Sequence, residues 1–572
     1  MAGRVAADVA QAVPAPEARR PGRPRWNRRW RPAVILAGVV LVGAWLWLLY
    51  GLSWRVMYNS DHANAVLAGR DLLGNPLLRG WVLPGDPYWL TSLPVFGLVA
   101  AVLGTGPRTM HAAPVLLDAS VVAAAWWLAG PGRRRPGRRV GTALVAVLVG
   151  LPHQVLAQFL FTTLHVGTAL VCLAAAALLA RDLRRPAWWA GVLLLAAAVV
   201  SDPFAVTVGV LPVVCAGAAA ALRQRRWAPV VAAAGAAVLA AIAAPLARHG
   251  LRLVGGFALA PALPLTPASY RLDNLRGIPE VFGALLGIGP VGGLSGVATF
   301  AHAVGAALFL LGIVVAAVRL VAALVQGRGE ASGPGSSPLP AGWLDDVLIA
   351  GVFGGLATFV FVTLPPRDLG SARYLITTLL YGALLAGRQL AWLTDRLASR
   401  GRAVVGVAVL ALAAAYLATP LRTVDRPRPA DPGRALVPWL AASDLRAGFG
   451  SYWTASIVTV ESGGRIPVRP LIAVDGRLRG YLYYSTRRWF TGRSGPDRWF
   501  LVYDSDHPSF GVDEQTARAT FGPPSMTVQR GAYRVLIWDH DLSRQLGPVW
   551  RDPERALARS PEAGRAVGRL RA

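Results

Sequence analysis

The sequence predicts an all-α polytopic membrane domain, followed by an extracytoplasmic α/β domain at the C-terminus. Of its 572 residues, 54% are hydrophobic and 15% are charged, whereas soluble domains carry about 25% charged residues. Long apolar runs recur over most of the chain, as in proteins that cross a membrane several times. From residue 420 on, the apolar runs become short and alternate with Gly, Pro, Asp and Ser. These patterns exclude a soluble globular enzyme, a disordered protein and a disulfide scaffold.

The charge pattern agrees with a membrane protein. The chain holds 58 basic and 30 acidic residues, for a net charge of +28, and every basic residue is an arginine. Most arginines lie either in short loops between apolar runs, where the positive-inside rule places them in the cytoplasm, or along the tail. We therefore expect no nucleic-acid partner. The two cysteines, Cys172 and Cys215, lie inside apolar runs and provide neither a disulfide framework nor a Cys-based metal site.

The first part of the chain predicts a basic cytoplasmic arm, residues 1–32, and a first crossing over Ala33–Leu52. The first outer loop covers residues 53–109. Within it, Trp89–Leu103 is apolar but shorter than the about 20 residues that a spanning helix needs. An arginine-rich loop follows the next apolar run, Met110–Gly130. Because that loop is cytoplasmic only if Trp89–Leu103 does not cross, we expect this segment to lie at the outer surface of the membrane.

The same alternation predicts eleven crossings in a membrane domain over residues 33–419, with the N-terminus inside and the C-terminus outside. The further helices are expected near residues 140–161, 164–180, 187–201, 203–222, 228–247, 296–325, 345–364, 374–391 and 403–419. No internal repeat and no broken helix is apparent. The remaining residues, 420–572, form the predicted outer domain.

Four short apolar runs in this tail predict strands of a mixed domain. They are Ser456–Glu461, Tyr481–Tyr484, Trp499–Tyr503 and Tyr533–Trp538. The tail also carries many arginines. Long domains cross the membrane largely regardless of their charge, so the tail is still expected outside.

Two carboxylates in the first outer loop are candidates for chemistry. Asp61 follows the first helix by about two turns and stands next to His62, and Asp86 precedes the short apolar segment. A carboxylate at the membrane surface can act as a general base on an acceptor hydroxyl. Each has another interpretation: Asp61 as the N-cap of a following helix, and Asp86 as part of an Asp-Pro turn beside interfacial aromatic residues.

Further polar and ionisable side chains fall at the predicted outer ends of other helices. They are His153, His165, Asp202, Arg373 and Tyr374. Each alone is commonly a cap or an interface anchor. Because ionisable groups at membrane depth are costly, together they indicate an outward-facing cavity for a charged head group. Arg373 is the natural phosphate partner, since a guanidinium can bind two oxygens at once. Asp118, inside a predicted span, is expected to pair with a neighbouring helix.

No sequence motif indicates a nucleotide or a bound metal. The P-loop, the GxGxxG fingerprint, HExxH and GxSxG are absent from the sequence. Two turns rich in Asp and His, residues 504–507 and 539–541, follow predicted strands, where such turns are common. No residue is therefore assigned as a metal ligand, and a divalent cation is the one cofactor left open.

Three stretches resemble the GT-C superfamily of membrane glycosyltransferases. The first outer loop, "SDHANAVLAGRDLLGNPLLRGWVLPGDPYWLTSLPVFGLVAAVLG", resembles the family's opening loop, with an Asp soon after the first helix, a short helix and a membrane-surface segment. The stretch "PPRDLGSARYL" resembles an Arg-Tyr start of a late helix, and "FGSYWTASIVTVESGGRI" resembles a segment of bacterial members. The chain departs from the family at Leu375, where a Pro is usual.

This resemblance implies a glycosyltransferase of the cell membrane. The sugar would pass from a polyprenyl-phosphate donor to a glycan, lipid or protein acceptor on the outer face. Asp61 would be the catalytic base or the carboxylate that positions the acceptor, Asp86 a second acidic site residue, and Arg373 a contact of the donor phosphate. The other substrate-binding residues would be His62, His153, His165, Asp202 and Tyr374. The residues leave two alternatives open: a transporter or lipid flippase, and a non-catalytic membrane scaffold.

Overall fold

The protein is described here by a computed structural model, which divides into two units, residues 1–47 and 48–572. The described residues are 31–128, 136–181, 184–260, 265–288, 294, 296–326, 342–362, 369–429, 432–491 and 496–550. In the first unit they belong to helix α1 (Arg31–Ser53), which ends in the second unit. All contacts reported below lie within the second unit.

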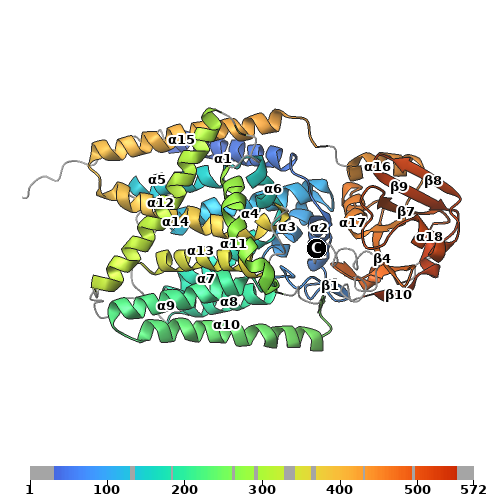
Figure 1. Cartoon of the computed structure of the whole chain (residues 1–572), viewed down its shortest axis with the longest axis horizontal. Coiled ribbons are helices and arrows are strands. Elements are labelled where there is room, and N and C mark those ends of the chain that lie inside the picture. Colours follow the sequence, from blue (N-terminus) through green and yellow to red (C-terminus); the bar gives the residue numbers. More distant parts are fainter. Residues whose placement is uncertain are drawn as a thin grey trace, which may run out of the picture. The chain divides into compact units, whose positions relative to one another are not determined.

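The second unit begins with a predominantly helical region (Figure 1). Its helices are α2 (Ser60–Leu72), α3 (Leu93–Leu103), α4 (Pro107–Leu128), α5 (Pro136–Leu148), α6 (Gln154–Thr162), α7 (His165–Leu179), α8 (Pro186–Ser201), η2 (Val206–Val210), α9 (Leu211–Gln224), α10 (Ala228–Leu253), α11 (Ala268–Leu286), α12 (Val297–Gln326), α13 (Trp343–Val362), η4 (Leu369–Leu375), α14 (Ile376–Arg396) and α15 (Ser399–Asp425).

Seven of the described helices are long and apolar enough to cross a membrane. They are α1, α4, α9 with η2, α10, α12, α13 and α15, and the pair α6 and α7 makes an eighth if it forms one span. Several carry exposed apolar side chains, such as Val314 and Val318 on α12 and Val407 and Leu410 on α15. Exposed apolar side chains along such helices indicate contact with lipid. The chain is therefore a membrane protein, and the count of eleven crossings stays a prediction.

The predicted helix near residues 140–161 is wrong. Helix α5 ends at Leu148 and α6 begins at Gln154, with Pro152 between them. Proline has no N–H for the helix ladder and disfavours helical geometry in the residue before it. A second break also departs from the predictions, because α6 and α7 meet at an angle of 75°. This bend places His165 at the start of a helix.

Helices α5 and α14 pack at close range. A Cβ added to Gly141 would lie 2.2 Å from the carbonyl oxygen of Gly387, and a Cβ on Gly387 would lie 2.6 Å from that of Gly141. Only glycine fits on either side, as in the small-residue seams between membrane helices. Since Arg373 and Tyr374 directly precede α14, this seam also fixes the position of two predicted site residues.

The C-terminal domain contains a seven-stranded mixed sheet. Its strands are β3 (Gly448–Ser451), β4 (Val468–Val474), β5 (Arg477–Tyr481), β7 (Trp499–Asp504), β8 (Met526–Arg530), β9 (Tyr533–Trp538) and β10 (Gly547–Trp550), in the order β10-β5-β4-β3-β7-β9-β8. Strand β3 runs parallel to β4 and β7, and β9 pairs antiparallel with β7 and β8. The predicted strands over Trp499–Tyr503 and Tyr533–Trp538 are confirmed.

Helices cover both faces of this sheet (Figure 1). Helices α16 (Pro432–Ala442) and α17 (Tyr452–Glu461) pack on the face that carries Phe500 and Val502. Helix α18 (Glu514–Phe521) packs on the opposite face, against Leu501. Successive residues of a strand point to opposite faces, so the continuous apolar run of β7 serves two cores.

The predicted strand over Ser456–Glu461 is wrong, because these residues form the second half of α17. The run is rich in β-branched residues, which favour strands. However, Ala455 and Val458 are three positions apart and both pack against the sheet, which is the spacing of a helix face. Tertiary packing therefore decides the structure against local propensity.

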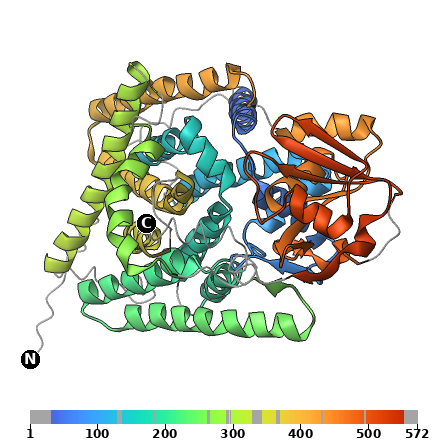
Figure 2. The ribbon, with the colours of Figure 1, turned by 45° about the vertical axis from the view of Figure 1, so that its right-hand side comes forward.

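A separate three-stranded sheet joins three distant parts of the second unit. Strand β1 (Trp81–Leu83) in the first outer loop pairs with β2 (Ala258–Leu259) after α10 and with β6 (Ser485–Thr486) of the C-terminal region. Figure 2 shows the C-terminal domain beside the blue outer-loop segments, and α17 contacts α2 directly. The first outer loop is therefore held between the helical region and the C-terminal domain.

Candidate functional site

A cavity of about 100 Å³ lies where the first outer loop, the α6–α7 break, η4 and the C-terminal domain meet. It is lined by Asn59, Asp61, His62, Pro84, Asp86, Tyr88, Thr162, Thr163, Leu164, His165, Arg373, Tyr374, Tyr483 and Tyr484. We call it the acidic cavity, after its two carboxylates. Its volume holds several water molecules but is below the 300–1,000 Å³ of typical small-molecule sites.

Asp61 lines the acidic cavity because another residue caps its helix. The side chain of Asn59 accepts hydrogen bonds from the backbone N–H groups of Asp61 and His62, at 3.1 and 3.4 Å. Asn59 is the N-cap of α2, so the interpretation of Asp61 as the cap is wrong. A carboxylate in the first turn still interacts favourably with the helix dipole. Its oxygens remain available for other partners.

Two groups from distant segments hold the Asp61 carboxylate. The hydroxyl of Tyr452, on α17, donates a hydrogen bond of 2.5 Å to Oδ1. Burial raises the pKa of Asp61 above its ordinary value, while this hydrogen bond and the charge of Arg373 act to lower it. Burial and the Asp61 charge raise the pKa of Tyr452 well above its ordinary value, so its hydroxyl keeps the donated proton. A carboxylate with a raised pKa suits a general base.

The hydroxyl of Tyr452 belongs to a larger contact between α2 and α17. Asn64 donates a hydrogen bond of 3.4 Å from Nδ2 to the Tyr452 hydroxyl. Ser456 in turn donates to Oδ1 of Asn64 at 2.5 Å. Both Asn64 and Ser456 are buried. This network fixes the direction from which the Tyr452 hydroxyl reaches Asp61.

His62 presents a neutral imidazole beside Asp61. Its Nδ1 lies 3.0 Å from Oδ1 of Asn59, and that oxygen already accepts two backbone N–H groups. The proton therefore sits on Nδ1, which leaves Nε2 as an acceptor. Burial and the charge of Arg373 lower the pKa of His62 to about 3. Nε2 is buried without a hydrogen-bond partner among the described residues.

The second carboxylate, Asp86, starts a chain of hydrogen bonds. It accepts the hydroxyl of Tyr88, whose oxygen lies 3.3 Å from Nε2 of His165. Nδ1 of His165 lies 2.7 Å from Oδ2 of Asp202, which also accepts from Thr168 at 2.7 Å. Burial raises the pKa of Asp86 above its ordinary value. The chain runs from the cavity wall to a buried carboxylate, so it can orient polar groups and redistribute protons.

Two aromatic residues of the cavity have strained backbones. Tyr88 has a φ of 51° and Tyr484 a φ of 46°, the left-handed region that non-glycine residues rarely adopt. Tyr88 is held there by its N–H, which donates to the carbonyl of Ser201 at 2.7 Å. Such strain costs about 1–3 kcal/mol per residue and is concentrated at functional sites.

Arg373 supplies the positive charge of the acidic cavity. It lies on η4, and its Cζ stands 5.2 Å from the ring centroid of Tyr374. Partial burial acts to lower the pKa of Arg373, but Tyr374 and the nearby carboxylates, Asp61 first, outweigh burial and raise it. Its guanidinium therefore stays charged next to two carboxylates.

Most of the predicted site residues come together in the structure. Asp61, His62, Asp86, His165, Arg373 and Tyr374 line the acidic cavity, and Asp202 stands behind His165. His153 is not one of the lining residues. Its Nε2 lies 3.0 Å from the carbonyl oxygen of Leu285, and its ring contacts His302.

Sequence reasoning missed several aromatic residues of the site. Tyr452 contacts Asp61, while Tyr483 and Tyr484 line the cavity from the C-terminal domain. The run of tyrosines at 481–484 was the available signal, although it predicts a strand. Strand β5 ends at Tyr481, and the next three residues turn toward β6 and the cavity.

No group of three His, Cys, Asp or Glu side chains in the described residues could hold a metal ion. Asp118, in α4, is buried, and among the described residues both its carboxylate oxygens lack hydrogen-bond partners. The predicted pairing of Asp118 with a neighbouring helix is therefore not found. Comparison of the chain with protein-family models, with curated proteins and with solved structures finds no match.

Proposed function

We propose that the protein is a membrane glycosyltransferase that takes a sugar from a polyprenyl-phosphate donor. The observation that carries the proposal is the acidic cavity, in which Asp61, Asp86 and Arg373 come together. A base and a phosphate-binding cation are the two groups that such a transfer needs. The resemblance of the first outer loop to the GT-C superfamily supports the same reaction, and the acceptor would be a glycan, a lipid or a protein.

In the proposed reaction, an acceptor hydroxyl attacks the anomeric carbon of the donor sugar. Asp61 takes the hydroxyl proton as the new C–O bond forms. The bond between the anomeric carbon and the phosphate oxygen breaks, and the lipid phosphate leaves with the electron pair. Arg373 stabilises the charge that develops on this phosphate. Tyr452 keeps Asp61 in place and favours its ionised form.

The second carboxylate has a positioning role in this proposal. Asp86 and Asp202 lie at the two ends of the hydrogen-bond chain through Tyr88 and His165. This chain holds Tyr88 and His165 in the wall of the cavity, where they can bind sugar hydroxyls.

The distribution of charge supports an outer-face location. His165, Ser201 and Arg373 lie at the cavity ends of α7, α8 and α14. The opposite ends of these helices lead to arginine-rich segments, such as residues 181–185 and 388–402. Under the positive-inside rule these segments are cytoplasmic, so the cavity belongs on the other side of the cell membrane.

The test is consumption of a lipid-linked sugar that depends on Asp61. Membranes that contain the wild-type protein or Asp61→Asn are incubated with radiolabelled polyprenyl-phosphate sugars, and loss of the lipid-linked label is followed. The expected result is consumption of one donor by the wild type and a loss of at least about 100-fold in Asp61→Asn, as for removal of a general base. Asp444→Asn is the matched control, since Asp444 is an exposed aspartate of the C-terminal domain.

One observation favours a second candidate, a transporter of the same lipid-linked sugar. Helices α6 and α7 form a broken pair whose break lines the acidic cavity, and broken helices form the substrate sites of many transporters. Purified protein in liposomes separates the two functions. Movement of an intact fluorescent polyprenyl-phosphate sugar across the bilayer, without loss of its sugar, would replace the transferase proposal.

A further inference from the structure

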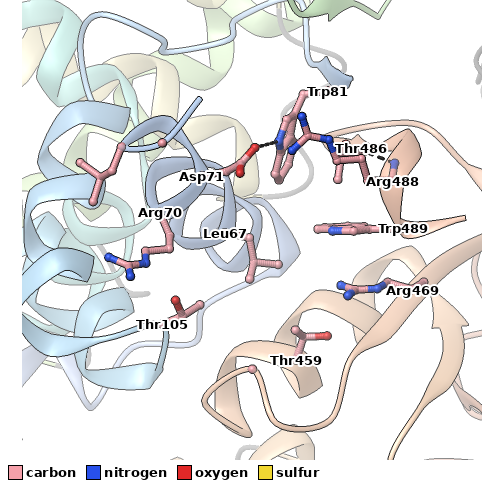
Figure 3. A pocket seen from close by; sticks show the side chains of 13 residues that line it. Leu67, Arg70, Asp71, Trp81, Thr105, Thr459, Arg469, Thr486, Arg488 and Trp489 are labelled. Atoms are coloured by element: carbon pink, nitrogen blue, oxygen red, sulfur yellow. Dashed lines mark hydrogen bonds between the residues drawn. The ribbon is translucent and has the colours of Figure 1, made fainter. Parts of the chain in front are cut away.

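A second and larger cavity, of about 590 Å³, lies on another face of α2 (Figure 3). It is lined by Leu67, Arg70, Asp71, Leu73, Gly74, Trp81, Thr105, Thr459, Gly464, Arg469, Thr486, Arg488 and Trp489. We call it the tryptophan groove. It shares no lining residue with the acidic cavity. Arg70 lies nine residues after Asp61, which corresponds to about 14 Å along the helix axis.

Positive charge dominates the tryptophan groove. Three arginines line it against one aspartate, Asp71. Figure 3 shows Arg70 and Asp71 on α2, on one side, and Arg469 and Arg488 on the C-terminal domain, on the other. Oδ2 of Asp71 already accepts from Nε1 of Trp81 at 2.7 Å and from Nδ2 of Asn75 at 3.0 Å. Asp71 therefore orients Trp81, and no described ion pair joins it to an arginine of the groove.

Arg469 is a partly buried cation of the groove. Among the described residues its guanidinium has no carboxylate partner, and its contact is the ring of Trp489, 4.5 Å from Cζ. Burial lowers the pKa of Arg469 to about 10. A cation that loses water without gaining a carboxylate is costly. A bound anion would remove this cost, so the groove is suited to a ligand with negative charge.

The aromatic residues indicate what else the ligand carries. The rings of Trp81 and Trp489 meet edge to face, with centroids 5.4 Å apart, and Trp489 is partly exposed. Three threonines, Thr105, Thr459 and Thr486, add hydroxyl groups to the lining. Flat rings next to hydroxyls and charges match a sugar ring, which has apolar C–H faces and a hydroxyl rim. Leu67 and Leu73 are the only aliphatic side chains in the described lining of the groove, which leaves too little apolar surface for a lipid chain.

We propose that the tryptophan groove binds an anionic saccharide, a short glycan that carries a phosphate or a carboxylate. The sugar ring packs on Trp489, and the anionic group binds Arg469 together with Arg70 or Arg488. The volume of the groove falls in the range of small-molecule sites. This binding does not depend on the chemistry of the acidic cavity. The additional assignment of the saccharide as the sugar acceptor rests on the proposed function.

Binding is measured with the full-length protein in lipid nanodiscs, by calorimetry. The probes are two matched pairs: a tetrasaccharide of alternating glucuronate and N-acetylglucosamine against one of N-acetylglucosamine alone, and mannobiose with and without a phosphate. Inorganic phosphate is the fifth probe. We expect one or both anionic saccharides to bind at least about tenfold more tightly than their neutral partners and than phosphate, because hydrogen bonds to charged groups are strong.

Variants then assign the binding to the groove. Arg469→Gln and Trp489→Ala should each lower the affinity for the anionic saccharide at least about tenfold. Arg70→Gln and Arg488→Gln change exposed side chains, so together they test the same site even if another change impairs folding. Arg477→Gln is the control, since Arg477 is an exposed arginine of the same domain outside the groove.

Three results would overturn the proposal: no binding of either anionic saccharide, equal binding of the neutral partners or of phosphate, and binding that Arg70→Gln and Arg488→Gln both leave unchanged. The two proposals fail separately. If the wild-type protein consumes no donor in an Asp61-dependent way but binds the anionic saccharide, the transferase proposal fails. If it consumes a donor but binds no anionic saccharide, the proposal of the saccharide site fails.

Discussion

The hydroxyl of Tyr452 donates a hydrogen bond of 2.5 Å to the carboxylate of Asp61, although the two residues are 391 positions apart in the chain. Asp61 belongs to the first outer loop and Tyr452 to the C-terminal domain. The tyrosine favours the ionised carboxylate, against the effect of burial. The C-terminal domain therefore contributes a group that lowers the pKa of the candidate base.

Tyr452→Phe should change the pH dependence of donor consumption. Without the hydroxyl, the pKa of Asp61 rises further, because a group that lowers it is lost. The ionised base disappears as the pH falls through this pKa, so the acid limb of the pH–rate profile should move to higher pH. The rate at alkaline pH should stay within a few-fold of the wild type. Trp453→Phe, a change of the neighbouring exposed residue on α17, should leave the profile in place. If the acid limb of Tyr452→Phe does not shift, the titration of Asp61 is not the cause of this limb.

Arg373→Lys should weaken the use of the donor while keeping the charge. An ammonium group cannot bind two phosphate oxygens in the planar geometry of a guanidinium. One lost charge-assisted hydrogen bond is worth about 1.5–3 kcal/mol, so kcat/KM for the lipid-linked sugar should fall at least about tenfold. Arg446→Lys, at an exposed arginine of the C-terminal domain, serves as the control. Equal kcat/KM values for Arg373→Lys and the wild type would argue against a phosphate contact.

The buried ion pair between Arg223 on α9 and Asp346 on α13 should be sensitive to single substitutions. The two side chains form two hydrogen bonds, one of 3.1 Å between Nη1 and Oδ1. Arg223→Met leaves a buried carboxylate unpaired and should lower the free energy of unfolding by about 3–5 kcal/mol. The double variant Arg223→Met/Asp346→Leu should recover most of this loss. Thermal unfolding in detergent measures both, and a double variant as unstable as the single one would contradict the expectation.

Asp118→Leu should stabilise the protein. Both carboxylate oxygens of Asp118 are buried without hydrogen-bond partners among the described residues. Removal of such groups recovers their desolvation penalty, about 1–3 kcal/mol, provided that the leucine fits. Ser120→Ala on the same helix is the matched control, because Ser120 is exposed and donates a hydrogen bond to the carbonyl of Leu116 in its own helix. A lower melting temperature of Asp118→Leu, relative to the wild type, would indicate that this carboxylate has a partner or a role.

The sequence predicted what depends on local patterns. Long apolar runs predicted the membrane helices, and the alternation from residue 420 on predicted a sheet-containing domain. The first outer loop and the outer ends of other helices together predicted six of the lining residues of the acidic cavity, among them Asp61 and Arg373. These features follow from periodicity and from the cost of charges in the membrane.

The features of the fold and the site that the sequence did not predict depend on contacts between distant segments. Tyr452 reaches Asp61, and Tyr484 reaches the cavity, only because α17 packs on α2 and β1 pairs with β6. Nothing in the local sequence of Tyr452 indicates this, and the pattern around Tyr484 predicts a strand. The error at residues 456–461 has the same origin, since packing against a sheet overrides the strand propensity of β-branched residues. Asn59 was a missed local signal, because it is a good N-cap residue two positions before Asp61.

The pairing of β1 with β6 also has a consequence for biosynthesis. The ribosome releases the carboxylates of the first outer loop long before Tyr452, Tyr483 and Tyr484 have been synthesised. The acidic cavity cannot close until the last quarter of the chain has emerged and folded against that loop. A nascent or prematurely terminated chain would thus insert its helices with an incomplete cavity, so maturation of the site is tied to completion of translation.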